Sequence, residues 1–373
     1  MAGTRVSFVP PPYPYDRLEG LKMLAERHDG GPVDCSIGTP VDAPPDFVIA
    51  ELAKGIGARG YPASIGSPDY REAGAAWLER RFAVTVGIDQ LAACVGTKEF
   101  VASLAQYLHL RSPERDTVLY PGVSYPTYAM SAALAGLRAV PVAMKNGELD
   151  LTSISPEDAE RALVLWSNSP SNPTGGLDDL EAVATWGRTH DVLVASDECY
   201  AEFTWTGRAR SILEFGIDGV LAVHSVSKRS NLAGVRAGFY VGDPEVVAFL
   251  RLVRQHAGLM VPGPVQSAVA LAYGDDAHVE TQRARYRSRL ELLAEALGAN
   301  GVDAPLPDGG FYLWCSMPGA DGWRLAEMLA DVAGLIVSPG ELYGDAGAPF
   351  VRIAVVQPDE RLALVASRLS ALG

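Results

Sequence analysis

The sequence has few of the features that mark metal-binding, disulfide-linked or membrane-spanning proteins. Its 373 residues include four cysteines without a C-x-x-C pair and six histidines without metal-ligand spacing. We therefore expect free thiols and no structural or catalytic metal. Apolar runs are too short to span a membrane, and the first twelve residues hold no stretch long enough for a signal peptide. These absences predict a cytoplasmic protein without a membrane partner.

Positive charge is also in short supply. The chain holds 31 Lys and Arg residues against 45 Asp and Glu residues, which gives a formal net charge of -14. A nucleic-acid-binding protein needs a basic face, so we expect no nucleic-acid partner. An anionic ligand would need a local pocket made by particular arginines. Apolar residues, in contrast, make up 48% of the chain, enough for a sizeable core.

The middle of the chain alternates short apolar runs with helical patterns. Runs rich in Val, Leu and Ala between helices are typical of an α/β fold with a mostly parallel sheet that is covered on both faces. We expect a seven-stranded sheet in a large domain that spans residues 41–276. The expected strands are residues 92–95, 117–120, 139–143, 162–166, 192–195, 220–224 and 237–241, and the clearest helices are residues 98–110, 177–190 and 244–255.

The pattern changes near residue 275, where a smaller α+β domain is predicted. The first forty residues are rich in Pro and Gly, and we expect them to pack with this unit. The small domain then comprises residues 1–40 and 277–373. Its expected helices are residues 277–297, 323–332 and 359–372, and its expected strands are residues 311–315, 334–337 and 350–355.

The most informative motif surrounds Lys228. Two hydroxyl residues, Ser225 and Ser227, flank this lysine, and Arg236 follows eight residues later. A lysine can form a Schiff base with an aldehyde, and hydroxyls with an arginine can neutralise a phosphate dianion. Pyridoxal 5'-phosphate makes both demands, so we expect it as the cofactor. The alternative is a solvated loop lysine without a chemical role.

Further candidates follow the predicted strands, and ligands bind at the carboxyl ends of strands in an open parallel sheet. Gly96, Thr97 and Lys98 open a helix, where backbone N–H groups bind anions. Asn172 lies in a rigid Pro-rich turn that could present it to a ligand oxygen. The plainer alternatives are an ordinary helix start and an ordinary turn.

Asp197, Tyr200 and Tyr125 also follow predicted strands. A carboxylate beside the ring nitrogen of the cofactor keeps that nitrogen protonated, and the protonated ring is an electron sink. A tyrosine hydroxyl can reach the phenolic oxygen of the same ring, and an aromatic face can stack on it. The alternatives are a helix-capping Asp, a packed Tyr and a core aromatic residue.

Together these motifs closely resemble the class I and II aminotransferases of fold-type I. The resemblance covers nearly the whole chain, and the combination is specific. In chain order the motifs are Tyr61-Pro62 with Gly66, Gly96-Thr97-Lys98-Glu99, Tyr125-Pro126-x-Tyr128, Asn172-Pro173-Thr174-Gly175, Asp197-Glu198-x-Tyr200, Ser225-x-Ser227-Lys228, Arg236, Gly310-Phe311-Tyr312 and Arg352.

The resemblance implies roles around the cofactor. Lys228 is expected as the Schiff-base lysine, with Asp197 as the partner of the ring nitrogen. Asn172 and Tyr200 are expected to hold the ring hydroxyl, and Tyr125 to stack on the ring. The residues expected to form the phosphate cup are Gly96, Thr97, Lys98 (through its backbone), Ser225, Ser227 and Arg236.

The resemblance also implies further roles outside that cup. Tyr61 is expected to reach the phosphate in the neighbouring subunit, which implies a homodimer with shared sites. Arg352 is expected to bind the substrate α-carboxylate bidentately, with a backbone contact from Gly38, and Asn172 is expected to bind the substrate as well. A salt bridge on the strand surface is the alternative for Arg352.

Residues 123–128, 227–232 and 254–262 resemble the succinyldiaminopimelate aminotransferases of bacteria. This implies transfer between glutamate and N-succinyl-2-amino-6-oxopimelate, in lysine and diaminopimelate biosynthesis. Arg229 could meet an extra substrate carboxylate or face the dimer interface. Other candidates for the distal part of the substrate are Tyr13, Tyr15 and residues 254–260.

Other functions remain possible on the same fold. An aspartate, alanine or aromatic aminotransferase, or a C–S lyase, would keep the same catalytic core. A regulatory module that senses the cofactor would carry a DNA-binding domain. The acidic charge and the lack of a basic helix-turn-helix segment before the fold argue against it.

Overall fold

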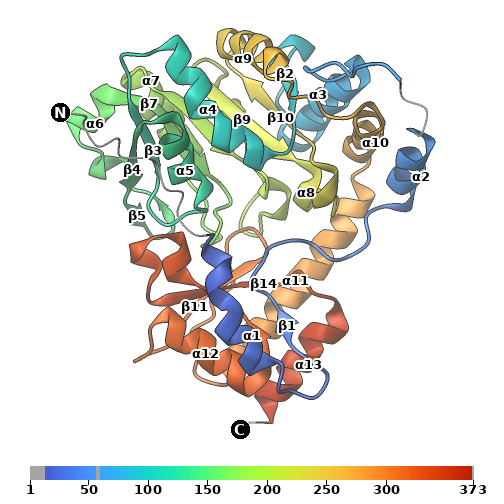
Figure 1. Ribbon diagram of the computed structural model, residues 1–373, viewed down its shortest axis with the longest axis vertical. Helices are drawn as coiled ribbons and strands as arrows, with labels where there is room; N and C mark the ends of the chain where they lie inside the picture. The colour runs from blue at the N-terminus through green and yellow to red at the C-terminus, as the bar shows by residue number, and fades with distance from the viewer. Residues whose placement is uncertain (1–12, 56–58, 372–373) are drawn as a thin grey trace, which may run out of the picture.

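A computed structural model describes residues 13–55 and 59–371. The fold is α/β, as predicted, and its centre is a seven-stranded sheet of order β2-β10-β9-β8-β7-β3-β4 (Figure 1). The signal-peptide expectation rests on residues 1–12, which lie outside the described residues. The strands are β2 (Leu91–Cys94), β3 (Thr117–Pro121), β4 (Arg138–Val142), β7 (Ala162–Asn168), β8 (Leu193–Asp197), β9 (Val220–Ser225) and β10 (Gly238–Gly242).

The sheet is mostly parallel, with β10 running antiparallel to both of its neighbours. Strand β7 is longer than predicted, because Asn168 continues the ladder and pairs with Asp197 of β8. The parallel strands therefore end together at one edge of the sheet. Asp197 lies at that edge, and so does the start of the short helix that carries Lys228.

Helices cover both faces of the sheet because side chains of successive strand residues point to opposite sides. On one face Leu104, Val164 and Leu250 belong to one core, and on the other Trp77, Leu165 and Val269 belong to a second. The helices of the first face are α4 (Thr97–Arg111), α5 (Thr127–Ala135) and α9 (Pro244–His256). Those of the second are α3 (Pro68–Phe82), α7 (Leu180–Thr189) and α10 (Gly263–Gly274).

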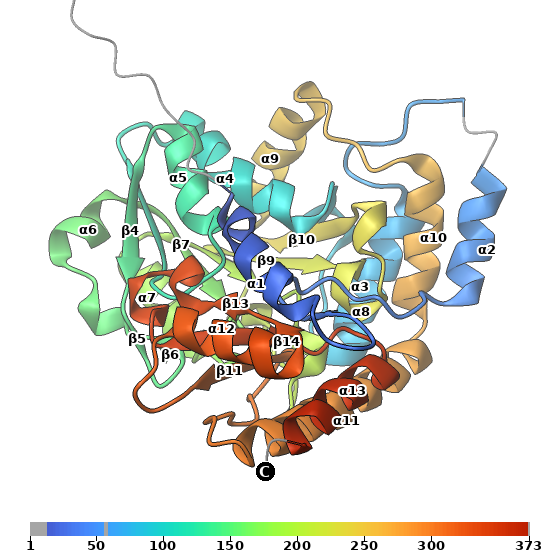
Figure 2. The same cartoon turned by 60° about the horizontal axis from the view of Figure 1, so that its bottom comes forward.

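A second unit lies below the large sheet in Figure 1 and combines both ends of the described chain. Strand β1 (Val33–Asp34) pairs with β12 (Leu335–Ile336). Helix α1 (Glu19–Ala25) packs on α12 (Gly322–Ala333), and Figure 2 shows these two helices side by side. The remaining elements are the connecting helix α11 (Ala277–Gly298), α13 (Asp359–Ser370) and a sheet of β11 (Tyr312–Ser316), β14 (Phe350–Ala354) and β13 (Ser338–Pro339). Where one strand was predicted at residues 334–337, the chain forms β12 and β13, each in a different sheet.

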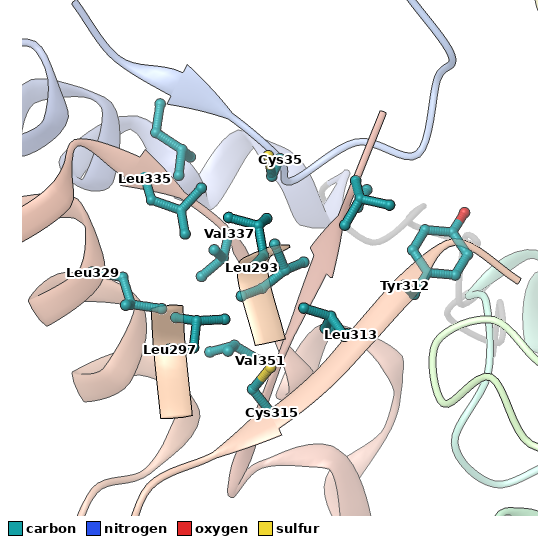
Figure 3. Close-up of a cluster of buried hydrophobic side chains, with 14 of the residues drawn as sticks. Cys35, Leu293, Leu297, Tyr312, Leu313, Cys315, Leu329, Leu335, Val337 and Val351 are labelled. Carbon is teal, nitrogen blue, oxygen red and sulfur yellow. The ribbon is translucent and has the colours of Figure 1, made fainter. Parts of the chain in front are cut away.

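One hydrophobic core unites this second unit (Figure 3). Cys35 from the N-terminal part belongs to the same buried cluster as Leu293 of α11, Leu313 of β11 and Val351 of β14. This core is in keeping with a small domain built from both ends of the chain. The exact domain boundaries, near residues 40 and 276, stay a prediction. The four cysteines are free thiols. Among the helices of the described residues, none has the length and apolar character needed to cross a membrane.

Shorter elements connect these parts, several of them single 3-10 turns. Among them are the helices α2 (Asp46–Lys54), α6 (Pro156–Arg161) and α8 (Val226–Arg229), and the hairpin of β5 (Met144–Lys145) with β6 (Glu148–Leu149). A 3-10 helix (Pro14–Leu18) precedes α1 and brings the N-terminal segment towards the edge where the parallel strands end.

Candidate active site

A cavity of about 430 Å³ lies at the carboxyl ends of the parallel strands, between the two units. Its volume suits a cofactor together with a small substrate. Four basic side chains (Lys98, Lys228, Arg236, Arg352) and one acidic side chain (Asp197) line it, so the acidic protein has the local cationic pocket that we expected. The other predicted residues in its wall are Gly38, Thr97, Tyr125, Asn172, Tyr200 and Ser227.

Lys228 extends into this cavity from the short helix α8. Ser225 caps that helix, since its hydroxyl accepts a hydrogen bond from the N–H of Ser227 at 3.1 Å. The Nζ atom of Lys228 donates to the carbonyl of Gly38. Burial lowers the pKa of this amine to about 8. A lysine with that pKa supplies an appreciable neutral fraction near neutral pH, as a nucleophile or a base requires.

Hydroxyls and a guanidinium converge at one end of the cavity. Ser227 and Thr97 line the wall, and the Ser225 hydroxyl donates to that of Ser227 at 2.8 Å from outside the cavity. Arg236 donates to the carbonyl of Ala233 at 2.8 Å. A Cβ atom at Gly96 would lie 2.3 Å from Nη2 of Arg236, so the arginine can approach only a glycine there. Together these groups suit a phosphate dianion.

Asp197 lies on another wall of the cavity, at the end of β8. Its Oδ2 atom accepts a hydrogen bond from the Tyr128 hydroxyl at 2.9 Å, and Oδ1 accepts one from the N–H of Cys199 at 3.2 Å. Burial raises the pKa of this carboxyl, while the hydrogen bonds oppose that change. The sequence motif contained Tyr128 but gave it no role.

Arg352 lines the cavity from β14, in the second unit. It is buried, with 1% of its surface exposed, and its guanidinium lies between the rings of Tyr312 (4.4 Å) and Tyr343 (4.9 Å). It donates to Oδ1 of Asn172 at 2.8 Å and to the carbonyl of Ser36. Within the described residues its Nε atom finds no acceptor. The alternative of a salt bridge on the strand surface is therefore wrong, because the side chain is buried beside the cavity.

Tyr200 and Gly38 pack around the Arg352 end of the cavity. The Tyr200 hydroxyl forms a 2.7 Å hydrogen bond with that of Tyr312. A Cβ atom at Gly38 would lie 2.2 Å from the Tyr312 hydroxyl, so only glycine fits there. Tyr312 belongs to the Gly310-Phe311-Tyr312 motif, and the sequence alone indicated no role for it.

Tyrosines and one lysine line the outer part of the cavity. Lys98 Nζ donates to the Tyr125 hydroxyl at 3.1 Å and lies 5.3 Å from the centre of the Tyr13 ring. Tyr15 forms a 3.0 Å hydrogen bond with the hydroxyl of Tyr343. The sequence assigned only the backbone of Lys98 to a site, whereas its side chain also reaches the cavity wall.

The prediction for Arg229 is wrong, and Arg254, the first residue of the candidate stretch 254–260, does not line the cavity either, while the rest of that stretch stays a prediction. Arg229 is buried and forms salt bridges with Glu202 and Asp276, so it meets neither a substrate carboxylate nor a dimer interface. Arg254 is buried too, and binds both carboxylate oxygens of Glu99, at 3.0 and 2.7 Å. Both guanidiniums therefore serve internal ion pairs.

Tyr61 lies away from the cavity of its own chain. Its side chain is 97% exposed. A role in the site of a neighbouring subunit, as predicted, would require such exposure. That role stays a prediction.

Comparison with known proteins finds the same family that the sequence motifs resemble. A family model described as aminotransferase class I and II matches residues 33–369. The chain is 44% identical to the 4-dedimethylamino-4-oxo-anhydrotetracycline transaminase OxyQ of Streptomyces rimosus, over 96% of this chain and 99% of that protein. It is 34% identical to the LL-diaminopimelate aminotransferase of Aquifex aeolicus, over 97% of both chains. A solved double mutant of Thermus thermophilus aspartate aminotransferase matches with a TM-score of 0.87 and 26% identity, over 98% of both chains.

Proposed function

The chain belongs to the class I and II aminotransferases, and on that premise we propose that it transfers an amino group from glutamate to N-succinyl-2-amino-6-oxopimelate. It is a pyridoxal-phosphate-dependent aminotransferase. The proposal concerns its substrates, its catalytic residues and its assembly. The reaction belongs to lysine and diaminopimelate biosynthesis.

The residues present fit the cofactor. Thr97, Ser227 and Arg236 would hold its phosphate, and Lys228 would supply the amine for its aldehyde carbon. Asp197 would serve its ring nitrogen, Tyr125 would stack on the ring, and Asn172 and Tyr200 would hold the ring hydroxyl. Bound there, the cofactor supplies an electron sink for the charge left at the substrate α-carbon when its proton is removed.

Lys228 moves the proton in this proposal. Its amine, with a pKa of about 8, would take the proton from the substrate α-carbon as a general base and would then deliver it, as a general acid, to the carbon that was the aldehyde carbon of the cofactor. Arg352 holds the α-carboxylate, and Asn172 and the two tyrosine rings keep its guanidinium in place.

The observation that carries the substrate proposal is the position of Lys98. The cavity has a buried guanidinium for one carboxylate and, in its outer part, an exposed ammonium flanked by Tyr13 and Tyr125. A substrate with a second, distant carboxylate suits this arrangement, and the succinylated keto acid has one. The phenol rings cover the chain between the two ends.

The test is a comparison of kcat/KM for a panel of acceptors, with glutamate as the donor. We expect the succinylated acceptor to exceed 2-oxo acids that lack a distal carboxylate, such as pyruvate, by at least tenfold, about 1.4 kcal/mol. Pyruvate equal to the succinylated acceptor would contradict the proposal. LL-diaminopimelate belongs in the donor panel, because relatives at 31–34% identity carry that activity in their names.

We also propose a homodimer with shared sites. Tyr61 is exposed, and apolar side chains on two nearby helices are exposed as well: Phe47 and Ile49 on α2, and Leu271 on α10. Helices α2 and α10 pack on each other, so these side chains can form one surface for a second copy.

A further inference from the structure

The carboxylate of Asp197 is held at both oxygens by groups of this chain. The Tyr128 hydroxyl donates to Oδ2 at 2.9 Å, and the N–H of Cys199 donates to Oδ1 at 3.2 Å. The backbone of Asp197 is fixed as well, because its carbonyl accepts a hydrogen bond from the side-chain amide of Asn168 at 2.9 Å. The carboxylate plane is thereby fixed relative to the cavity.

Tyr128 is itself rigidly placed. Its side chain is 2% exposed, and its ring lies 5.3 Å from the ring of Trp166 in the sheet. Its carbonyl accepts a hydrogen bond from the Ser131 hydroxyl at 2.7 Å, in the first turn of α5. A buried tyrosine normally directs its hydroxyl at a polar partner, and here that partner is Asp197.

We propose that Tyr128 is a positioning residue, which acts through Asp197 by fixing the orientation of the carboxylate and keeping it ionised. This inference rests on the proposed role of Asp197 as the partner of the cofactor ring nitrogen. Burial favours the neutral acid, whereas a donor hydrogen bond favours the carboxylate. Three other groups bear on the same carboxyl: the Cys199 thiol, the Cys199 N–H and the Lys228 amine. The hydrogen bond from Tyr128 to the Asp197 carboxylate can be removed without disturbing the packing, because Tyr128→Phe deletes one oxygen and keeps the ring.

The test is a pH titration of Asp197 in the cofactor-free protein, by NMR of 13C-labelled aspartate, with Asp197→Asn to assign the signal. In Tyr128→Phe we expect the pKa of Asp197 to rise by about one pH unit. Tyr273→Phe is the matched control, because Tyr273 is also buried and its hydroxyl has no partner within the described residues. That variant should leave the signal unchanged.

The cofactor-loaded enzyme gives a second readout. In Tyr128→Phe we expect kcat with glutamate to fall about tenfold while KM changes little, since the lost interaction acts after substrate binding. An unchanged pKa of Asp197 in Tyr128→Phe would overturn the inference, whatever happens to kcat. If the pKa rises but wild-type enzyme takes no amino group from glutamate, the positioning role stands and the proposed function fails.

Discussion

Lys228 is an ordinary lysine in sequence whose surroundings change its acidity. Burial lowers its pKa to about 8, whereas a solvated lysine has a pKa near 10.4. Only the neutral amine attacks an aldehyde, and the neutral fraction grows as pH rises through the pKa. We predict that the rate at which cofactor-free protein captures pyridoxal phosphate rises between pH 6 and 9, with a midpoint near 8. Stopped-flow absorbance measures this rate, and a midpoint near 10 would contradict the assignment.

Lys98 is the residue on which the substrate proposal depends. Lys98→Met keeps the aliphatic stem and the backbone N–H but removes the charge. A hydrogen bond to a charged group contributes about 1.5–3 kcal/mol, so we predict that KM for the succinylated acceptor rises at least tenfold. KM for pyruvate, which lacks the second carboxylate, should stay within about twofold. An equal change for both acceptors would mean that Lys98 does not read the distal carboxylate.

Gly96 shows how one missing side chain shapes the phosphate end. Its φ is +78°, and a Cβ atom would meet the Arg236 guanidinium at 2.3 Å. Gly96→Ala should therefore weaken cofactor binding about tenfold or more, measured by equilibrium dialysis. Gly136→Ala is the control, because Gly136 has a similar φ of +71° with no atom within 4 Å. It should lower stability by about 1 kcal/mol without changing cofactor affinity, and equal losses in both variants would point to backbone strain alone.

Thr97, Tyr125, Asn172, Asp197 and Lys228 were predictable from the sequence because each ends or follows a strand of the large sheet, at the edge where ligands bind. Arg236 and Arg352 do not follow such a strand, and only the resemblance assigned Arg352 a role. Tyr128, Tyr312 and the Lys98 side chain could not be assigned, since their roles depend on distances between segments far apart in sequence. For the same reason Arg229 was misread and the ion pair of Arg254 was not recognised. Their acidic partners, Glu202 and Glu99, are remote in sequence, so nothing nearby indicated buried ion pairs.

At the scale of elements, the seven strands of the large sheet begin and end within two residues of their predicted bounds. Helices α5 and α10 were not predicted. Their sequences, TYAMSAALA and GPVQSAVALAYG, are apolar almost all round and show no single stripe. Helix α3 was missed for the opposite reason, since it is rich in charge and even buries Arg71. In all three cases tertiary packing decides the structure.

Helix α9 offers a prediction at this scale. Asp243 caps it by accepting the N–H groups of Glu245 and Val246, each at 3.0 Å, and its other oxygen accepts the N–H of Gly219 at 2.9 Å. Asp243→Ala should lower the free energy of unfolding by about 1–2 kcal/mol with KM unchanged. Asp179→Ala, which removes the single capping bond of α7, should cost less. Thermal unfolding checks both, and the reverse order would contradict this account of the caps.

At the scale of the whole molecule, the proposed dimer predicts complementation. In a heterodimer of Lys228→Ala and Tyr61→Ala protomers, one of the two sites keeps both Lys228 and a Tyr61 supplied across the interface. Half of the dimers in a random mixture are heterodimers, so refolding the two variants together should give about a quarter of wild-type activity. Activity no greater than that of the separate variants, or a monomer in sedimentation, would refute shared sites.

The most direct test of the central claim is a single-turnover absorbance measurement on purified enzyme loaded with pyridoxal phosphate. Glutamate should deplete the absorbance band of the lysine-bound cofactor, and N-succinyl-2-amino-6-oxopimelate should restore it faster than oxaloacetate or pyruvate. Lys228→Ala should show no such band. Restoration that favours another acceptor would leave the aminotransferase chemistry and contradict the substrate, whereas a normal band in Lys228→Ala would contradict the account of the site.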